Sequence, residues 1–253
     1  MKYLCILFIA VLNLSLPTYS YSNSLMKVRQ EQVLTDLFDQ LVKRQINSEV
    51  AIEKSVNALL ENYPEQIDTV LKIAITKHPQ EYKQIMCGAL RAEPALTSDV
   101  VDTILKANIA KSSDVISFAV TLEPAYAQEI VDSAVLHDPL DIENIIRVAI
   151  VTEPVMAKNV VKNTMLSYPE KLLDILVVAI KTLPDQVVNI VRDTLTISPD
   201  NTEVVSIAVS SSNGNKAREI IATAIKSGLS EESATAAAVA GGAKKTDIAK
   251  QNN

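Results

Sequence analysis

The fold is decided by two consecutive stretches of sequence, PAYAQEIVDSAVLHD at positions 124–138 and PLDIENIIRVAIVTE at positions 139–153. Each opens with proline and carries apolar or small residues at its positions 4, 7, 8, 11 and 12. These offsets place the apolar side chains on one face of an α-helix, whereas a β-strand would require alternation in twos. Each stretch therefore predicts one short amphipathic helix.

A unit of this length, here called a row, recurs along most of the chain, and a position within it is called a column. Ile109 and Gly214 stand where two further prolines are expected, without a change of register. A proline in column 1 suits the start of a helix and excludes the preceding residue from the helical conformation. We therefore expect helices of about 11 or 12 residues, separated by turns of about three or four. Prolines occupy column 1 at Pro64, Pro79, Pro94, Pro124, Pro139, Pro154, Pro169, Pro184 and Pro199.

A second period, of two rows, is visible at column 10, which is apolar in one set of rows and polar in the rows between them. We expect the first set to form a more buried layer and the second an outer layer, with two rows making one helical hairpin. Helices this short are marginal alone in water, so their stability must come from stacking on neighbours. The apolar residues are Phe118, Val148 and Val178, and the polar residues are Thr103, Ser133, Asn163 and Asp193.

The predicted fold is all-α: an α-solenoid, a right-handed superhelix of about six short hairpins with about 15 residues per helix. The repeat array covers residues 49–228. Residues 21–48 form an N-terminal segment with an amphipathic capping helix, and residues 229–253 form a C-terminal cap and a disordered tail. Residues 1–20 read as a signal peptide, because a lysine precedes a short apolar run and Thr18-Tyr19-Ser20 then has the small-x-small pattern of a cleavage signal. We therefore expect export to the periplasm or beyond the cell.

Composition excludes some classes of partner. Loss of positions 1–20 removes one lysine and no acid, so the net charge changes from −6 to about −7. This charge argues against nucleic acid, which requires a basic face. No later stretch is long and apolar enough to span a bilayer. Only Cys87 remains after the expected cleavage, so the exported chain cannot form an internal disulfide.

The rows resemble the short proline-punctuated helical repeats, roughly P-x-x-A-x-x-I-V-x-x-A-I, of uncharacterised exported proteins of Gram-negative bacteria. The resemblance covers residues 49–228 and implies the architecture alone, without an activity, a cofactor or a catalytic residue. The residues that carry it are Pro124, Ala127, Ile130, Val131, Ala134 and Val135, and again Pro154, Ala157, Val160 and Val161.

The chain carries no recognisable catalytic motif. Its two histidines, His78 and His137, both lie beside a proline and are separated by several rows, so a shared metal or acid–base site is not expected. Five glycines form no phosphate-binding loop, and no nucleophile motif is present. We expect a protein that is not an enzyme and has no cofactor or metal site.

Cys87 occupies column 9, beside the apolar columns. Three interpretations stay open: a partly buried small residue, the link of a disulfide-bonded dimer, or a reactive thiol.

Two sets of residues are candidates for contact with a partner. The tyrosines qualify because interface hot spots favour this residue, although they also serve as packing residues. The glutamates each precede a proline at intervals of two rows, and form either an acidic ladder or ordinary helix-terminal carboxylates. The candidates are Tyr63, Tyr82, Tyr126, Tyr168, Glu93, Glu123 and Glu153.

Charges predicted for the outer layer change sign along the chain. They form either a mixed, solvated face or an array that is electrically polar from end to end, which would suit self-association. The acidic residues are Asp99, Asp102, Glu129 and Asp132, and the basic residues that follow are Lys158, Lys162, Arg192 and Arg218.

The sequence therefore predicts an exported, non-enzymatic helical-repeat protein that acts as a scaffold for an unknown protein or peptide, because such arrays create extended binding surfaces. The alternative is a self-assembling structural component of the cell envelope, in which copies associate through Cys87 or through end-to-end pairing of charges.

Overall fold

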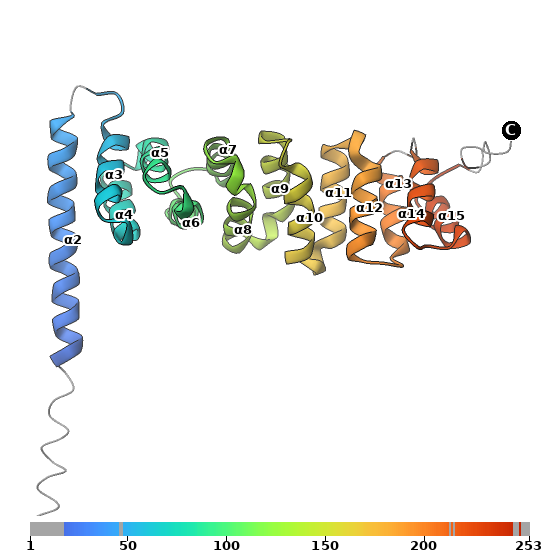
Figure 1. Ribbon diagram of the computed structural model, residues 1–253, viewed down its shortest axis with the longest axis horizontal. Helices are drawn as coiled ribbons and strands as arrows, with labels where there is room; N and C mark the ends of the chain where they lie inside the picture. Colours follow the sequence, from blue (N-terminus) through green and yellow to red (C-terminus); the bar gives the residue numbers. More distant parts are fainter. Residues whose placement is uncertain (1–17, 46–47, 213, 215, 245–247, 249–253) are drawn as a thin grey trace, which may run out of the picture. The chain divides into compact units, whose positions relative to one another are not determined.

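The regular structure of the described residues is helical throughout, which confirms the predicted all-α class (Figure 1). The chain divides into two compact units, residues 1–92 (unit 1) and residues 93–253 (unit 2), and each is treated separately below. The computed structural model describes residues 18–45, 48–212, 214, 216–244 and 248.

Unit 1 contains a long helix followed by three short ones. The long helix α2 packs on α3 and α4, and α3 packs closely on α5. Leu34 and Phe38 of α2 are buried, and the ring of Phe38 lies 5.8 Å, centre to centre, from that of His78. The predicted capping segment thus lies within α2. The helices are α2 (Thr18–Arg44), α3 (Ala51–Asn62), α4 (Ile67–Lys77) and α5 (Tyr82–Ala92).

Unit 2 is built from two layers of short helices, in which each helix packs on the next helix of its own layer and on its neighbours in the chain (Figure 1). Layer A contains α7 (Ser112–Leu122), α9 (Ile142–Thr152), α11 (Leu172–Thr182), α13 (Thr202–Ser211) and α15 (Glu231–Ala240). Layer B contains α6 (Thr97–Lys106), α8 (Ala127–His137), α10 (Ala157–Ser167), α12 (Val187–Ile197) and α14 (Ala217–Lys226).

Most row prolines open short 3₁₀ turns, and the α-helix begins directly after the turn. The residue before the proline lies outside the helical region, for example Tyr63 (φ −137°) and Glu123 (φ −130°), because the proline ring disfavours the helical conformation there. Proline therefore starts the turn and not the α-helix itself, which refines the prediction. The turns are η1 (Pro64–Gln66), η2 (Pro79–Glu81), η3 (Pro94–Leu96), η4 (Pro124–Tyr126), η5 (Pro139–Asp141), η6 (Pro169–Lys171) and η7 (Pro184–Gln186).

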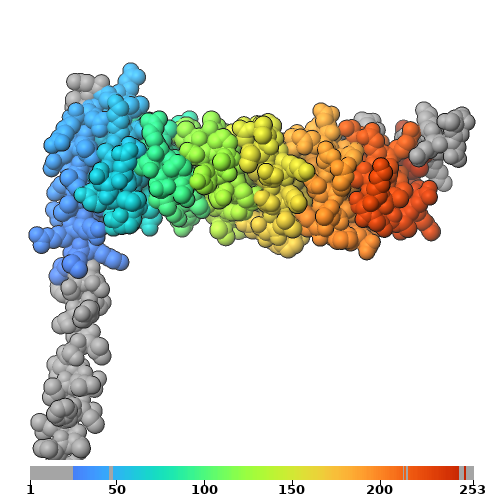
Figure 2. Space-filling model, viewed as in Figure 1, coloured from blue at the N-terminus to red at the C-terminus, as the bar shows by residue number. Residues whose placement is uncertain are grey.

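The apolar columns form the core of each unit. In α9, the predicted face is buried throughout, and the equivalent residues of α11 are buried as well. Side chains close the spaces between successive helices (Figure 2). The buried residues of these columns are Ile142, Ile145, Ile146, Ala149 and Ile150 in α9, and Leu172, Ile175, Leu176, Ala179 and Ile180 in α11.

Two junctions depart from the proline pattern and place a residue other than glycine in the left-handed region. Asn108 (φ 51°) follows α6 where the next row lacks its proline. Asp200 (φ 61°) follows Pro199, and Asn201 then caps α13 by accepting a hydrogen bond from the Glu203 amide. Both junctions replace the 3₁₀ turn with a left-handed residue. The buried residues of α7 keep their columns, whereas those of α13, such as Val204 and Val205, fall one column early.

A polar outer layer implies that the column 10 residues of layer B face solvent, but two of them contact a neighbouring helix. Ser133 is buried, and its Oγ lies 2.7 Å from that of Ser98 on the neighbouring helix α6. Asp193 pairs with Lys158 of α10 at 3.8 Å, across the same interval in sequence. Ser133 and Asp193 therefore connect adjacent helices of one layer, because at these two places column 5 of one row meets column 10 of the second row after it. Asn163, in the same column of α10, is exposed.

Two predictions concern residues that lie mostly outside the described part. Residues 1–17, the greater part of the expected signal peptide, are outside it, and α2 begins at Thr18. Most of the expected C-terminal tail after Lys244 is also outside it. Within the described part, no helix combines the length and the apolar character needed to cross a bilayer.

Candidate functional site

The strongest candidate for a binding site is an open groove on layer A of unit 2, between α9 and α11. Its volume is about 1060 Å³. Leu140 lies at one end of the groove, in the turn before α9, and Val151 lies at the other end of the same helix. These two side chains are 92% and 60% exposed. Because both side chains line the same groove, it can contact apolar groups of a bound segment.

Charged side chains line the groove between its apolar ends. Arg147 of α9 and Lys181 of α11 supply positive charge, while Asp141 and Glu143 supply negative charge near the Leu140 end. Val178 of α11 is buried and forms apolar lining. The arrangement can hold apolar side chains at its two ends and an acidic group between them.

Layer B carries a second groove, of about 890 Å³, between α6 and α8. Asp99 and Asp102 give its lining an acidic character, and Leu136, which is 76% exposed, lies beside them. Asp102 also pairs with Lys106 at 2.6 Å, one turn along the same helix.

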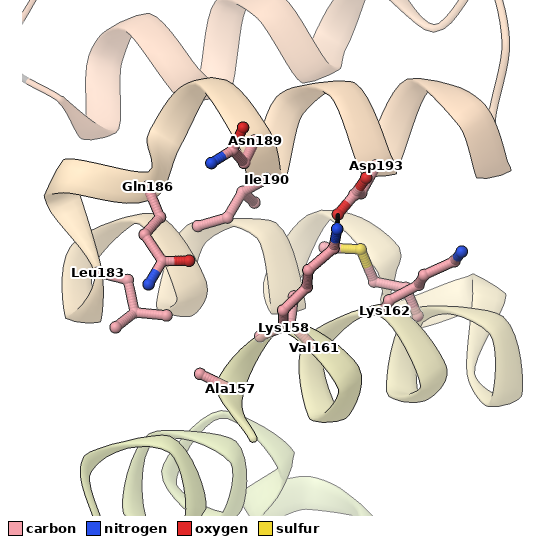
Figure 3. Close-up of a pocket in the computed structure, with 10 residues that line it drawn as sticks. Ala157, Lys158, Val161, Lys162, Leu183, Gln186, Asn189, Ile190 and Asp193 are labelled. Atoms are coloured by element: carbon pink, nitrogen blue, oxygen red, sulfur yellow. Dashed lines mark ion pairs between the residues drawn. The ribbon is translucent and has the colours of Figure 1, made fainter. Parts of the chain in front are cut away.

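A third groove, of about 330 Å³, lies between α10 and α12 of the same layer and is basic (Figure 3). Ala157, Val161 and Ile190 supply apolar lining, and Lys158 reaches across to Asp193 (Figure 3). Lys162 is exposed and has no carboxylate within 4 Å among the described residues. Layer B thus changes from acidic to basic between α8 and α10, as the sequence predicts.

Burial perturbs two titratable groups at this boundary. It raises the pKa of Asp132 on α8, an effect that the nearby Glu129 adds to and that the hydrogen bond donated by Gln128 (2.9 Å) opposes. Burial also raises the pKa of Tyr168, and the negative charges of Asp132 and Glu170 raise it further. Tyr168 and Asp132 therefore lie close together, although they belong to different rows of the sequence.

The α6–α8 groove contains serine, histidine and aspartate without forming a catalytic triad. Ser98 and Ser133 bond to each other, and Asp102 is paired with Lys106. Among the described residues, no hydrogen bond joins His137 to any of these groups. A nucleophile must contact its base, so this arrangement does not indicate acyl transfer. No group of three or more His, Cys, Asp or Glu side chains able to hold a metal ion occurs in the described residues.

The predicted tyrosines are distributed over both units. Tyr63, which is exposed, and Tyr82 belong to unit 1, where Tyr63 follows α3 and Tyr82 begins α5. Tyr126 and Tyr168 belong to unit 2 and are half-buried. None of them lines the α9–α11 groove.

The predicted glutamates are half-buried in the turns between rows. Glu123 and Glu153 follow α7 and α9, which pack side by side, so these two lie on one edge of unit 2. Glu153 accepts a hydrogen bond from the Val155 amide at 3.2 Å and thus caps its own turn. Glu93 begins unit 2 before η3. This local capping favours the helix-terminal interpretation for Glu153.

Cys87 is half-buried on α5 in unit 1 and has no disulfide partner among the described residues. Burial raises the pKa of its thiol, the Glu53 carboxylate raises it further, and the Arg91 guanidinium opposes both effects. A raised pKa reduces the thiolate fraction at neutral pH, which disfavours the interpretation as a reactive thiol.

The residues of the α9–α11 groove were not predicted as contacts. A signal for them was nevertheless present, because Leu140 and Val151 are apolar residues in columns 2 and 13, outside the buried face. Leu136, Val155 and Leu166 depart from the pattern in the same columns, and all three are exposed. Apolar residues in columns that otherwise face solvent mark the candidate surfaces.

Comparison of the chain with protein-family models, with curated proteins and with solved structures found no significant match.

Proposed function

We propose that the chain is an exported, non-enzymatic helical-repeat protein that binds a segment of another protein in the α9–α11 groove. The observation that carries this proposal is the pairing of two exposed apolar side chains, Leu140 and Val151, at the ends of one groove with charged side chains between them. Repeat arrays use such continuous surfaces between stacked helices to hold extended ligands.

The chemistry of the groove defines the segment. Leu140 and Val151 lie about three helical turns apart along one row, which corresponds to about 17 Å. A bound segment needs two apolar side chains at about this separation, supplied by about five extended residues or by about three helical turns. An acidic side chain between them would meet Arg147 and Lys181.

Export is supported by the lysine, the short apolar run and the small residues of positions 1–20, which together have the pattern of a cleaved signal peptide. The partner is accordingly proposed to be a protein of the cell envelope or of the exterior.

Site-specific photo-crosslinking in the native cell tests the proposal. A photoreactive amino acid at Val151 should capture one foreign protein, whereas the same group at the exposed Lys226 of α14 should not. The captured protein is then identified by mass spectrometry and purified. It should bind the wild-type chain directly, and Arg147→Glu together with Lys181→Glu should weaken binding by about tenfold or more, since two charge pairs are reversed.

A control variant, Lys226→Glu together with Lys244→Glu, makes the same change in net charge at exposed positions outside the groove. It should leave the affinity unchanged. Equal loss of binding in both double variants, or capture of the same protein from both crosslinking positions, would contradict the proposed site.

A second candidate, self-association as an envelope component, is favoured by the order of charges along layer B. That order concerns a different surface from the α9–α11 groove.

A further inference from the structure

The outward face of layer B carries a self-complementary order of charge. Columns 2, 6, 9 and 13 lie on one side of each helix, away from the buried columns. Column 9 contains an acid on α6 and α8 and a base on α10 and α12. The four residues are Asp102, Asp132, Lys162 and Arg192, at intervals of two rows.

We propose that this face is an interface between two copies of the chain, related by a two-fold axis that runs parallel to the helices between α8 and α10. Rotation about this axis brings α8 of one copy onto α10 of the second copy, and α6 onto α12. Asp132 then meets Lys162 of the second copy, and Asp102 meets Arg192 of the second copy. Every such contact occurs twice, because a two-fold interface uses the same patch of both subunits.

The apolar residues of the face match under the same axis. Leu136 on α8 and Leu166 on α10 both occupy column 13, and they are 76% and 55% exposed. The rotation brings Leu136 of each copy onto Leu166 of the other copy. Apolar contact at the centre with charge pairs around it is the usual composition of a specific interface.

The contacts within unit 2 show that equivalent columns are aligned along layer B. Ser98 meets Ser133 between α6 and α8, and Lys158 meets Asp193 between α10 and α12, at the same interval in sequence. Residues of one column therefore occupy equivalent places on the two helices of each of these pairs, and between them Gln128 of α8 lies 3.5 Å from Thr164 of α10. The acid-lined groove between α6 and α8 accordingly faces the base-lined groove between α10 and α12 of the second copy.

Other arrangements of two copies are less favourable. A two-fold axis perpendicular to the helices would bring α8 onto α8 and would oppose Asp132 and Glu129 of one copy to the same acids of the second. A head-to-tail stack of acidic on basic ends would leave unpaired faces at both ends and would grow into open filaments. In column 9, the order of acid, acid, base and base pairs completely only in the closed dimer, which brings the acids of column 6, Asp99 and Glu129, onto asparagines.

The size of the face predicts a weak, reversible dimer. Four helices, each about 17 Å long and about 10 Å apart, offer about 700 Å² per copy, which is near the lower end for specific interfaces. Charge pairs that stay partly exposed are screened by salt. Dimerisation should therefore require high protein concentration and low ionic strength. It does not depend on the proposed partner, because the α9–α11 groove lies on layer A.

Analytical ultracentrifugation of the mature chain, residues 21–253, tests the dimer. The wild type should be dimeric at low salt and dissociate at about 0.5 M salt. Asp132→Lys alone, or Lys162→Asp alone, should weaken the dimer by about 10- to 100-fold, because each substitution opposes like charges at two places. An equal mixture of these two variants should dimerise again. In the mixed dimer the two substituted residues meet as base and acid at one place, and the unchanged Asp132 and Lys162 meet at the other, so no like charges are opposed.

The mixture also separates loss of the interface from loss of folding, since misfolded chains could not restore the dimer. Glu203→Lys, an equal change of charge at an exposed position on α13 of layer A, should dimerise as the wild type does. The proposal would be overturned by a wild type that stays monomeric at all concentrations, by single variants that dimerise normally, or by growth beyond the dimer.

Discussion

Gly88 of α5 lies directly against the backbone carbonyl oxygen of Glu53 on α3, so closely that a Cβ atom at position 88 would overlap that oxygen. Gly241, just after α15, has the same relationship to the carbonyl oxygen of Ser206 on α13. In both places a missing side chain lets two helix backbones approach, since any larger residue would hold them apart. The close packing of α3 on α5 in unit 1 depends on this contact.

Gly88→Ala should destabilise the protein, although alanine favours helices over glycine by about 1 kcal/mol. The added methyl group meets rigid backbone and not a movable side chain, and overpacking of this kind costs about 1–3 kcal/mol. Urea unfolding followed by circular dichroism measures the change. Cys87→Ala, on the same helix but half-buried, is the control and should change the free energy of unfolding far less. A Gly88→Ala protein more stable than the wild type would show that α3 and α5 separate easily.

Glu53 and Arg91 form an ion pair whose partners differ in burial: the Glu53 side chain is 11% exposed and the Arg91 side chain 68%. Arg91→Met should lower the free energy of unfolding by about 1–3 kcal/mol, because it leaves a buried carboxylate without its partner. The exposed pair of Lys72 with Glu31 is the matched comparison, and Lys72→Met should cost less than about 1 kcal/mol. Equal costs for the two variants would show that burial of Glu53 does not strengthen the pair.

Asp200 holds a left-handed conformation that most side chains disfavour (φ 61°). Asp200→Gly should raise the free energy of unfolding by up to about 1 kcal/mol, because glycine adopts this conformation without strain. Asp200→Val should lower it by about 1 kcal/mol or more, since a branched side chain fits this region poorly. Thermal unfolding of the three proteins should rank them as glycine, aspartate and valine. A different order would mean that the Asp200 side chain adds more to the free energy of unfolding than the left-handed backbone conformation takes from it.

The repeat made the helices and their buried faces predictable from sequence. Columns 4, 7, 8, 11 and 12 identified the buried residues of α9, such as Ile145 and Ile146, because a helical period is a local property. The prolines located the turns for the same reason, although most of them open a 3₁₀ turn before the α-helix.

The remaining features depend on contacts between rows, which a repeat alone does not determine. Ser133 was expected on a solvated outer layer but is buried against Ser98, since column 10 faces the adjacent helix of its own layer. The close approach of α3 to α5 follows from Gly88, which stands in column 10, where the other rows carry larger side chains. The α9–α11 groove depends on Leu140 and Val151 in solvent-facing columns of one row, but its other side, with Lys181, comes from α11, and the sequence of one row does not show which helix lies beside it.

Asp132 links folding stability to pH. Its pKa is raised in the folded chain by burial, so the folded state holds its proton more tightly than the unfolded state does. The stability that this group contributes is present when it is protonated and is lost as the pH rises through the folded-state pKa. Asp132→Asn should therefore raise the midpoint of unfolding at pH 7, and the difference from wild type should vanish as the pH falls below the ordinary aspartate value of 3.8.

Unfolding at high salt, where association is suppressed, measures this effect. The same variant should lower the pKa of Tyr168, since it removes a neighbouring negative charge, and absorbance titration of the tyrosines reports that change. Asp99→Asn on α6, at an exposed position, serves as the control. No gain of stability at pH 7, together with an unchanged Tyr168 titration, would contradict the stated environment of Asp132.

The most direct test of the proposed binding function is hydrogen exchange of the mature chain, measured by mass spectrometry with and without the captured partner. Binding in the groove should slow exchange in α9, in α11 and in the turn that carries Leu140, while α3, α4 and layer B of unit 2 stay unchanged. Protection confined to the turns that carry Tyr63 or Tyr126, or no protection at a saturating concentration of the partner, would contradict the α9–α11 groove as the binding site.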